Sequence, residues 1–193
     1  MKKRNIWIYL FIFIGASSWF WFSLPHPLFQ SPYSTTIIAQ KGELLNVRIA
    51  ADEQWRFAPI EKVPEKYAQA VIQYEDKSFY QHLGINPLAI IRALKQNIQE
   101  NRIVSGASTI TMQVIRLAKN NPERTLWEKI IEMILATRLE LTTSKKEILK
   151  LYASHAPFGG NIVGLNAASW AYYRRSPGKL SWAEAATLAV LPN

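Results

Sequence analysis

The feature that most constrains this chain is an unbroken apolar stretch near its N-terminus, residues 6–24, rich in Ile, Phe and Trp. About twenty such residues suffice for a helix to cross the hydrocarbon core of a bilayer. A basic run at 2–4 precedes the stretch, and no further Lys, Arg, Asp or Glu occurs until Lys41. Because basic flanks stay in the cytoplasm, we expect residues 1–5 to form a cytoplasmic tail, residues 6–24 a transmembrane helix, and the remainder to be exported.

A cleaved signal peptide is the alternative interpretation of this stretch. The small residues Gly15-Ala16-Ser17-Ser18 follow a short apolar run, as they would at a cleavage site. The aromatic continuation Trp19-Phe20-Trp21-Phe22 argues against cleavage there and favours an uncleaved anchor.

Composition narrows the possible partners. The chain of 193 residues has no cysteine, so an exported fold must be stabilised by its core without disulfides. Its net charge of +9 suits an anionic partner. Nucleic acid is the usual candidate, but an exported domain does not share its compartment. We therefore expect an anionic lipid surface or a phosphate-bearing lipid, and no nucleic acid.

The exported part is predicted to be mainly α-helical. Residues 25–34, with three prolines, indicate a linker. Two β-prone runs within 35–49, on either side of Lys41-Gly42, predict a small hairpin. From residue 64 onward the apolar spacing is helical. One predicted helix starts with Asn86 as its N-cap and Pro87 at its first position; its expected buried face is Leu88, Ile91, Leu94 and Ile98.

Three further helix starts carry the S/T-x-x-E pattern of a capping box, in which side chain and backbone bond reciprocally. The three pairs are Thr125 with Glu128, Ser144 with Glu147, and Ser181 with Glu184.

Residues 75–84, Glu-Asp-Lys-Ser-Phe-Tyr-Gln-His-Leu-Gly, are the first unusual stretch. The spacing of Ala68, Ile72, Glu75 and Phe79 places the carboxylate of Glu75 on an apolar stripe. A carboxylate in such surroundings is a candidate general base. The alternative is a structural carboxylate, and the spacing alone favours that alternative.

Residues 106–113, Gly-Ala-Ser-Thr-Ile-Thr-Met-Gln, form the second unusual stretch. By itself it indicates a loop in which Ser108 or Thr109 caps the following helix. The order of motifs along the chain changes this interpretation. The series EDxxFxxHxG, GxSTITxQ, a helix with K-x-x-E and LE, and KxxILxxY before FGG resembles glycosyltransferase family 51, the peptidoglycan glycosyltransferases of class A penicillin-binding proteins. It is most similar to the branch of penicillin-binding protein 1C, and the resemblance covers residues 35–193.

The resemblance implies a role for each matching residue. Glu75 matches the general base and Glu132 the second acidic residue, both catalytic. The residues expected to bind substrate are Asp76, Phe79, His82, Ser108, Thr109, Gln113, Arg116 and Lys129. The implied fold is a lysozyme-like glycosyltransferase domain beside a membrane-embedded hydrophobic part, which we expect near residues 102–121 through Ile103, Val104, Ile110, Val114, Ile115 and Leu117.

The implied reaction is polymerisation of lipid II onto a growing glycan strand, with inversion at the anomeric carbon and release of undecaprenyl diphosphate. Glu75 would take the proton of the acceptor hydroxyl, and cations would stabilise the leaving diphosphate. The resemblance further implies a divalent cation, Mg²⁺, and contact with other cell-wall synthesis proteins. The expected location is the bacterial cytoplasmic membrane, with the catalytic domain on the outer side.

The chain departs from the family pattern at several positions. Glu128 stands where an Arg is usual, Tyr152-Ala153-Ser154 replaces Tyr-Leu-Asn, and Arg174-Arg175 replaces Gly-Lys. We expect His155 to be a surface or packing residue. Two alternatives therefore stay open, a non-catalytic lipid II-binding protein and a lysozyme-like hydrolase.

The C-terminal part carries its own expectations. Relatives continue beyond position 193 with further helices, so we expect a domain without them. The chain contains none of the S-x-x-K, S-x-N and K-T-G set of a transpeptidase domain, so we expect no penicillin binding.

Overall fold

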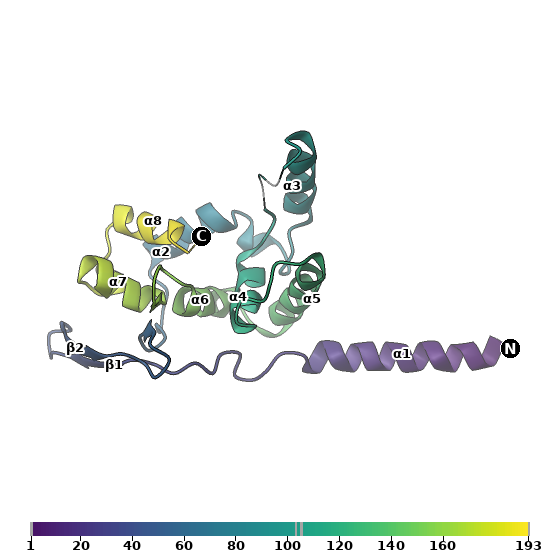
Figure 1. The fold of residues 1–193 in the computed structure, drawn as a ribbon, viewed down its shortest axis with the longest axis horizontal. Coiled ribbons are helices and arrows are strands. Elements are labelled where there is room, and N and C mark those ends of the chain that lie inside the picture. The colour runs from purple at the N-terminus through teal and green to yellow at the C-terminus, as the bar shows by residue number, and fades with distance from the viewer. Residues whose placement is uncertain (1, 103, 105, 193) are drawn as a thin grey trace.

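The computed structural model describes residues 2–102, 104 and 106–192, and it is mainly helical, as predicted (Figure 1). The α-helices of the described residues are α1 (Lys2–Phe22), α2 (Glu65–Glu75), α3 (Pro87–Gln99), α4 (Ile110–Ala118), α5 (Leu126–Thr142), α6 (Lys145–His155), α7 (Leu165–Tyr173) and α8 (Trp182–Val190). Two short 3₁₀ turns, η1 (Phe79–Gln81) and η2 (Pro177–Lys179), lie between them.

The predicted hairpin is confirmed. Strand β1 (Thr35–Ile38) pairs antiparallel with β2 (Leu44–Arg48), and Thr35 lies opposite Arg48. Gly42 in the connecting turn has a φ of +82°, a conformation that glycine adopts without strain. A second pair, β3 (Trp55–Arg56) with β4 (Ile162–Val163), is parallel and was not predicted. In Figure 1 the hairpin and α1 extend from opposite ends of the molecule.

Helix α4 lies at the centre of the fold, where it packs against α5 and α6, while α2 packs against α8. Ile110, Met112, Val114 and Ile115 of α4 are at most 1% exposed. A helix that is apolar on all sides is a core helix. The expectation that Ile110, Val114 and Ile115 form an exposed membrane surface is therefore wrong, because the surrounding helices cover them. Leu117 is partly buried, and Ile103 lies outside the described residues.

The predicted buried face of α3 is exposed. Leu88, Ile91, Leu94 and Ile98 have exposed fractions of 56–79%, and Ala93 is the residue of α3 that is buried. Figure 1 shows the reason, because α3 stands away from the other helices. The apolar spacing was recognised correctly, but no described part of the chain covers that face. The helix start is confirmed, since Asn86 accepts a hydrogen bond from the Ala89 N–H.

Residues 25–34 pack along the domain. Leu24, Leu28 and Phe29 contact the core, and the Phe29 ring stacks on His155 with ring centroids 3.6 Å apart. His155 is 8% exposed, so it is the packing residue that we expected.

Among the described residues, no helix combines the length and the apolar character needed to cross a membrane. The transmembrane helix predicted at residues 6–24 is therefore not supported by the structure.

The three predicted caps begin helices, but only one forms a complete box. Ser181 accepts from the Glu184 N–H, and the Glu184 carboxylate accepts from the Ser181 N–H. At the other two starts the hydroxyl caps the helix, while Glu128 pairs with Lys119 and Glu147 with Lys150.

Candidate active site

The two unusual stretches of the sequence meet at Glu75. This residue ends α2, because Asp76 leaves the helical conformation with φ −158° and ψ 75°. Gln113, one turn into α4, donates a hydrogen bond from its Nε2 to Glu75 Oε2 at 2.6 Å. Glu75 is half-buried and lines a cavity of about 150 Å³ with Ser78, Asn86, Arg92 and Ser108 among its other walls. The amide fixes the direction of the carboxylate at the cavity.

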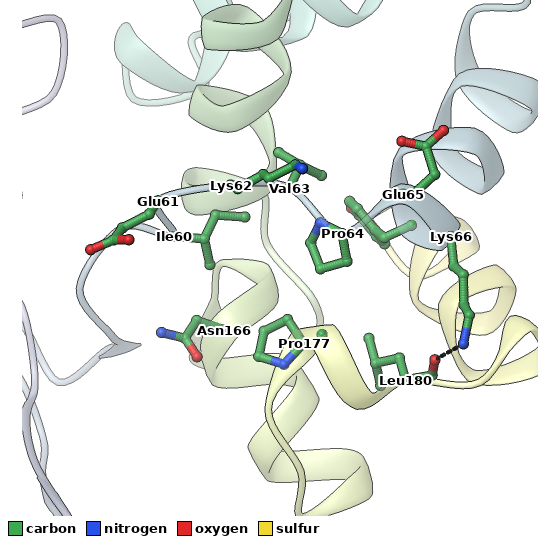
Figure 2. Close-up of a pocket in the computed structure, with 12 residues that line it drawn as sticks. Ile60, Glu61, Lys62, Val63, Pro64, Glu65, Lys66, Asn166, Pro177 and Leu180 are labelled. Carbon is green, nitrogen blue, oxygen red and sulfur yellow. Dashed lines mark hydrogen bonds between the residues drawn. The ribbon is translucent and has the colours of Figure 1, made fainter. Parts of the chain in front are cut away.

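A larger pocket of about 650 Å³ lies at the other end of α2 (Figure 2). Its walls include Ile60, Pro64, Pro177 and Leu180, and Lys66 Nζ donates to the Leu180 carbonyl at 2.9 Å. None of the predicted site residues lines it. We therefore place the candidate active site at the smaller cavity, where the predicted base lies.

Asp76 and His82 lock the loop that follows Glu75. Asp76 is 6% exposed, and His82 donates from Nε2 to both carboxylate oxygens of Asp76, at 3.0 Å each. Asp76 Oδ2 also accepts the N–H of Ile110, the first residue of α4, at 3.2 Å. The buried carboxylate thus connects the loop to the helix that carries Gln113.

Thr109 and Gly84 strengthen the same connection. Thr109 is the N-cap of α4, accepting the Met112 N–H at 3.1 Å, and its hydroxyl donates to the Gly84 carbonyl at 2.6 Å. Gly84 has a φ of +83°, and a Cβ there would lie 2.7 Å from the backbone of Ala136. Only glycine fits this approach to α5. Phe79 is fully buried in the core.

A second group of predicted residues gathers around Glu132 on α5. Its side chain is 7% exposed, and Lys129 Nζ lies 3.1 Å from Glu132 Oε2. Arg116 Nε lies 4.0 Å from Glu132 Oε1. Lys129 also donates to the hydroxyl of Ser108 at 2.7 Å. Two cations therefore surround one carboxylate, which leaves a net positive charge that suits an anionic group such as a phosphate.

Helix α4 connects the two groups. Gln113 and Arg116 are three residues apart, so they share one face of the helix. Gln113 contacts the first acidic residue, and Arg116 lies beside the second. No printed contact joins Glu75 to Glu132 directly, so their relative position depends on α4 and on the packing around it.

Two buried tyrosines, Tyr67 of α2 and Tyr152 of α6, lie within the electrostatic reach of Glu75. Burial raises the pKa of Tyr67, and the neighbouring Tyr152 and Glu75 raise it further. Burial also raises the pKa of Tyr152, with a smaller contribution from Glu75. Their hydroxyls have no hydrogen-bond partner in the described part of the chain. Both groups stay neutral near pH 7 and keep the surroundings of Glu75 free of a second charge.

The described residues contain no cluster of three or more His, Cys, Asp or Glu side chains that could hold a metal ion. The buried carboxylates of the site already have cationic or hydrogen-bonding partners, Asp76 in His82 and Glu132 in Lys129. The chain's own residues therefore do not form a metal site in this region.

Sequence reasoning missed several charged contacts around the site. Lys119 pairs with Glu128, and Lys145 pairs with Glu140 at 2.6 Å. Lys145 begins the recognised KxxIL motif, and Glu140 belongs to the LE of the preceding helix. The motif was the available signal, but the sequence could not indicate what these side chains contact.

These features define a class of protein, one with an acidic residue at a cavity and a second acidic residue held between cations on a helical scaffold. Comparison with known proteins identifies the family. A family model described as transglycosylase matches residues 41–193. The chain belongs to the transglycosylase family, and the resemblance noted in the sequence is confirmed.

Individual relatives support the same assignment. The chain is 42% identical over 200 residues to penicillin-binding protein 1C of Escherichia coli (strain K12), covering 100% of this chain and 26% of that protein. It is 38% identical over 174 residues to penicillin-binding protein 1A of Aquifex aeolicus (strain VF5), covering 88% and 24%. It is 36% identical over 170 residues to penicillin-binding protein 1A of Neisseria cinerea, covering 88% and 21%. The chain thus spans about a quarter of the length of these curated relatives.

Proposed function

We propose that this chain is a peptidoglycan glycosyltransferase that joins lipid II units into glycan strands. The observation that carries the proposal is the hydrogen bond from Gln113 to Glu75, at 2.6 Å. It joins the first and second family motifs at a cavity, while the same helix brings Arg116 to the group around Glu132.

In the proposed reaction Glu75 acts as general base. It takes the proton of the acceptor's GlcNAc 4-hydroxyl as that oxygen forms a bond to the anomeric carbon of the donor strand. The bond from the anomeric carbon to the diphosphate oxygen breaks with its electron pair, and undecaprenyl diphosphate leaves. Attack on the face opposite to the leaving group inverts the sugar.

The leaving group needs positive charge more than it needs a proton. Lys129 and Arg116 supply this charge, because both lie against Glu132 with side chains that are 36% and 24% exposed. Such fixed cations stabilise charge that develops in the transition state. Glu132 holds them in place. Gln113 keeps Glu75 aimed at the cavity, which makes its proton acceptor available at the right moment.

The expected Mg²⁺ would arrive on the substrate diphosphate, since the described residues form no metal cluster of their own. Magnesium in phosphate chemistry is commonly held by substrate phosphates with one or two carboxylates. Polymerisation assays with and without EDTA, followed by readdition of Mg²⁺, test this expectation.

We propose that the domain works at the outer surface of the bacterial cytoplasmic membrane, where its lipid-linked substrates and other cell-wall synthesis proteins would lie. Three helices support this location through exposed apolar side chains. On α1 these include Trp7, Phe11 and Phe22, and on α3 they are Leu88, Ile91, Leu94 and Ile98. On α5 they are Leu126, Trp127, Ile130 and Ile134. Exposed apolar area of this kind marks a lipid or protein interface.

The decisive experiment is incubation of the protein with labelled lipid II, followed by separation of the products on a gel. Wild type should give glycan polymers, and Glu75→Gln should lose about 10²–10⁴-fold in rate because the amide cannot accept the proton. Glu61→Gln, a glutamate beside the larger pocket, is the matched control and should retain activity. Wild-type turnover by Glu75→Gln would refute the assignment of the base.

The same gel separates the two alternatives. A lysozyme-like hydrolase shortens preformed glycan strands, whereas a non-catalytic protein retains lipid II without extending it.

A further inference from the structure

A second charged cluster lies outside the cavity, where α5 meets α6. Lys145, the first residue of α6, places its Nζ 2.6 Å from Glu140 Oε1 on α5. The Glu140 side chain is 2% exposed and that of Lys145 is 19% exposed. This is the most deeply buried Lys–Glu pair among the described residues.

The pair also contacts two other segments. Lys145 Nζ donates to the backbone carbonyl of His82 at 2.7 Å and lies 4.5 Å from the centre of the Phe79 ring. Thr111 of α4 donates its hydroxyl proton to Glu140 Oε1 at 2.5 Å. Lys145, Glu140, Thr111 and the His82 carbonyl form what we call the Lys145 cluster.

The segments joined by the Lys145 cluster are those that carry the proposed active site. His82 belongs to the loop that begins directly after Glu75 and is held by Asp76. Thr111 is two residues from Gln113 on α4. Glu140 is eight residues from Glu132 on α5, about 12 Å along the helix. The cluster therefore connects the Glu75 side of the site to the Glu132 side without lining the cavity.

A buried ion pair is a poor means of gaining stability, because desolvation of the two charges offsets their attraction. Apolar side chains could fill the same space. They could not donate to the His82 carbonyl, however, nor accept the hydroxyl of Thr111. What the charges add is a fixed arrangement of three segments.

We propose that Lys145 and Glu140 are positioning residues that set the distance and orientation between Glu75 and Glu132. The proposal rests on the proposed glycosyltransferase function. It assigns neither residue a contact with substrate. They act through the loop that follows Glu75 and through α4.

The test compares four variants of the full chain in lipid II polymerisation. Lys145→Met removes the donors, Glu140→Gln keeps the shape without the charge, and Lys145→Arg keeps both charge and donors. Lys150→Met is the matched control, because Lys150 lies on the same helix in a more exposed pair with Glu147. Misplacement of catalytic groups by about 1 Å can cost about 10²-fold in rate. We expect kcat to fall by about that factor in Lys145→Met, with KM changed less than about threefold.

The other variants sharpen the comparison. Glu140→Gln should show a smaller fall in kcat, since Lys145 still reaches the His82 carbonyl. Lys145→Arg should recover most of the lost turnover, and Lys150→Met should match wild type. Because Glu140→Gln is nearly isosteric, it keeps the test possible if Lys145→Met does not fold.

Amide hydrogen exchange gives a readout that does not depend on activity. In Lys145→Met, or in Glu140→Gln if the former does not fold, residues 76–84 and the start of α4 should lose protection, whereas Lys150→Met should leave them unchanged. Unchanged exchange, or unchanged kcat in an active protein, would overturn the proposal. An inactive wild type would instead refute the proposed function, and hydrogen exchange alone would then decide whether the Lys145 cluster holds the loop.

Discussion

Replacing Arg174 by glycine should stabilise the protein. Arg174 is the C-cap of α7 and has φ 53° and ψ 37°, the left-handed helical conformation. A residue with a Cβ pays about 1–2 kcal/mol for this conformation. Glycine pays no such cost, but it increases the freedom of the unfolded chain by about 0.4–1 kcal/mol. The difference is a net gain of about 0.5–1 kcal/mol.

Little else should change with this substitution. Arg174 is exposed, and the N–H of the same residue, which donates to the Trp170 carbonyl at 3.1 Å, is retained by glycine. For a chain of this size, 1 kcal/mol corresponds to about 2–4 °C in melting temperature. We therefore expect Arg174→Gly to melt about 1–4 °C above wild type in thermal and urea unfolding.

Arg174→Ala separates the backbone effect from loss of the guanidinium. Alanine keeps the Cβ and the strained conformation, so this variant should melt close to wild type. If alanine raised the melting temperature as much as glycine, the gain would come from removing charge. If Arg174→Gly melted below wild type, the left-handed cap would not be a source of strain.

Three further predictions follow from contacts of the site and the core. Gln113→Met should lower kcat by about 10–10²-fold in polymerisation assays, because a hydrogen bond to a charged group contributes about 1.5–3 kcal/mol; full activity would show that Glu75 needs no such donor. Glu128→Arg should raise the initial rate by freeing Lys119, at a stability cost of at most about 1 kcal/mol for this partly exposed pair; an unchanged rate, with Glu128→Gln as control, would make Glu128 purely structural. Burial, followed by the charge of Arg56, lowers the pKa of His155, so the unfolded state binds the proton more tightly than the folded state. Stability measured by urea unfolding should therefore fall as the pH drops below about 6.5, the ordinary value for histidine, and His155→Gln should flatten this dependence; greater stability at pH 5 than at pH 8 would contradict it.

The parts of the fold that the sequence predicted are those decided within one or two turns of the chain. Asn86, Thr109 and Thr125 each cap a helix as their residue types predict. Gly42 and its neighbours form the expected hairpin. In each case the deciding hydrogen bond or backbone angle lies within a few residues of the signal.

Contacts between distant residues were not predictable in this way. Lys145 donates to a carbonyl 63 residues earlier in the chain, and any exposed or buried acceptor would be compatible with its sequence neighbours. The pairing of Glu128 with Lys119 had a local competitor, the capping box. The longer contact was formed instead, because the Thr125 hydroxyl already satisfies the Glu128 N–H.

Helix α3 shows the limit of hydrophobic periodicity most clearly. The spacing of its apolar residues identifies one face of the helix, and the structure confirms that this face exists. Periodicity does not say which surface covers it. Ala93 is buried, while Leu88 and Ile98 are more than three-quarters exposed. A soluble core helix would bury these residues, since each large apolar side chain removed from water contributes about 1.5–3 kcal/mol. In the proposed function a lipid surface covers them, and α3 and the apolar side of α5 then hold the cavity at Glu75 close to substrates that are themselves anchored in lipid.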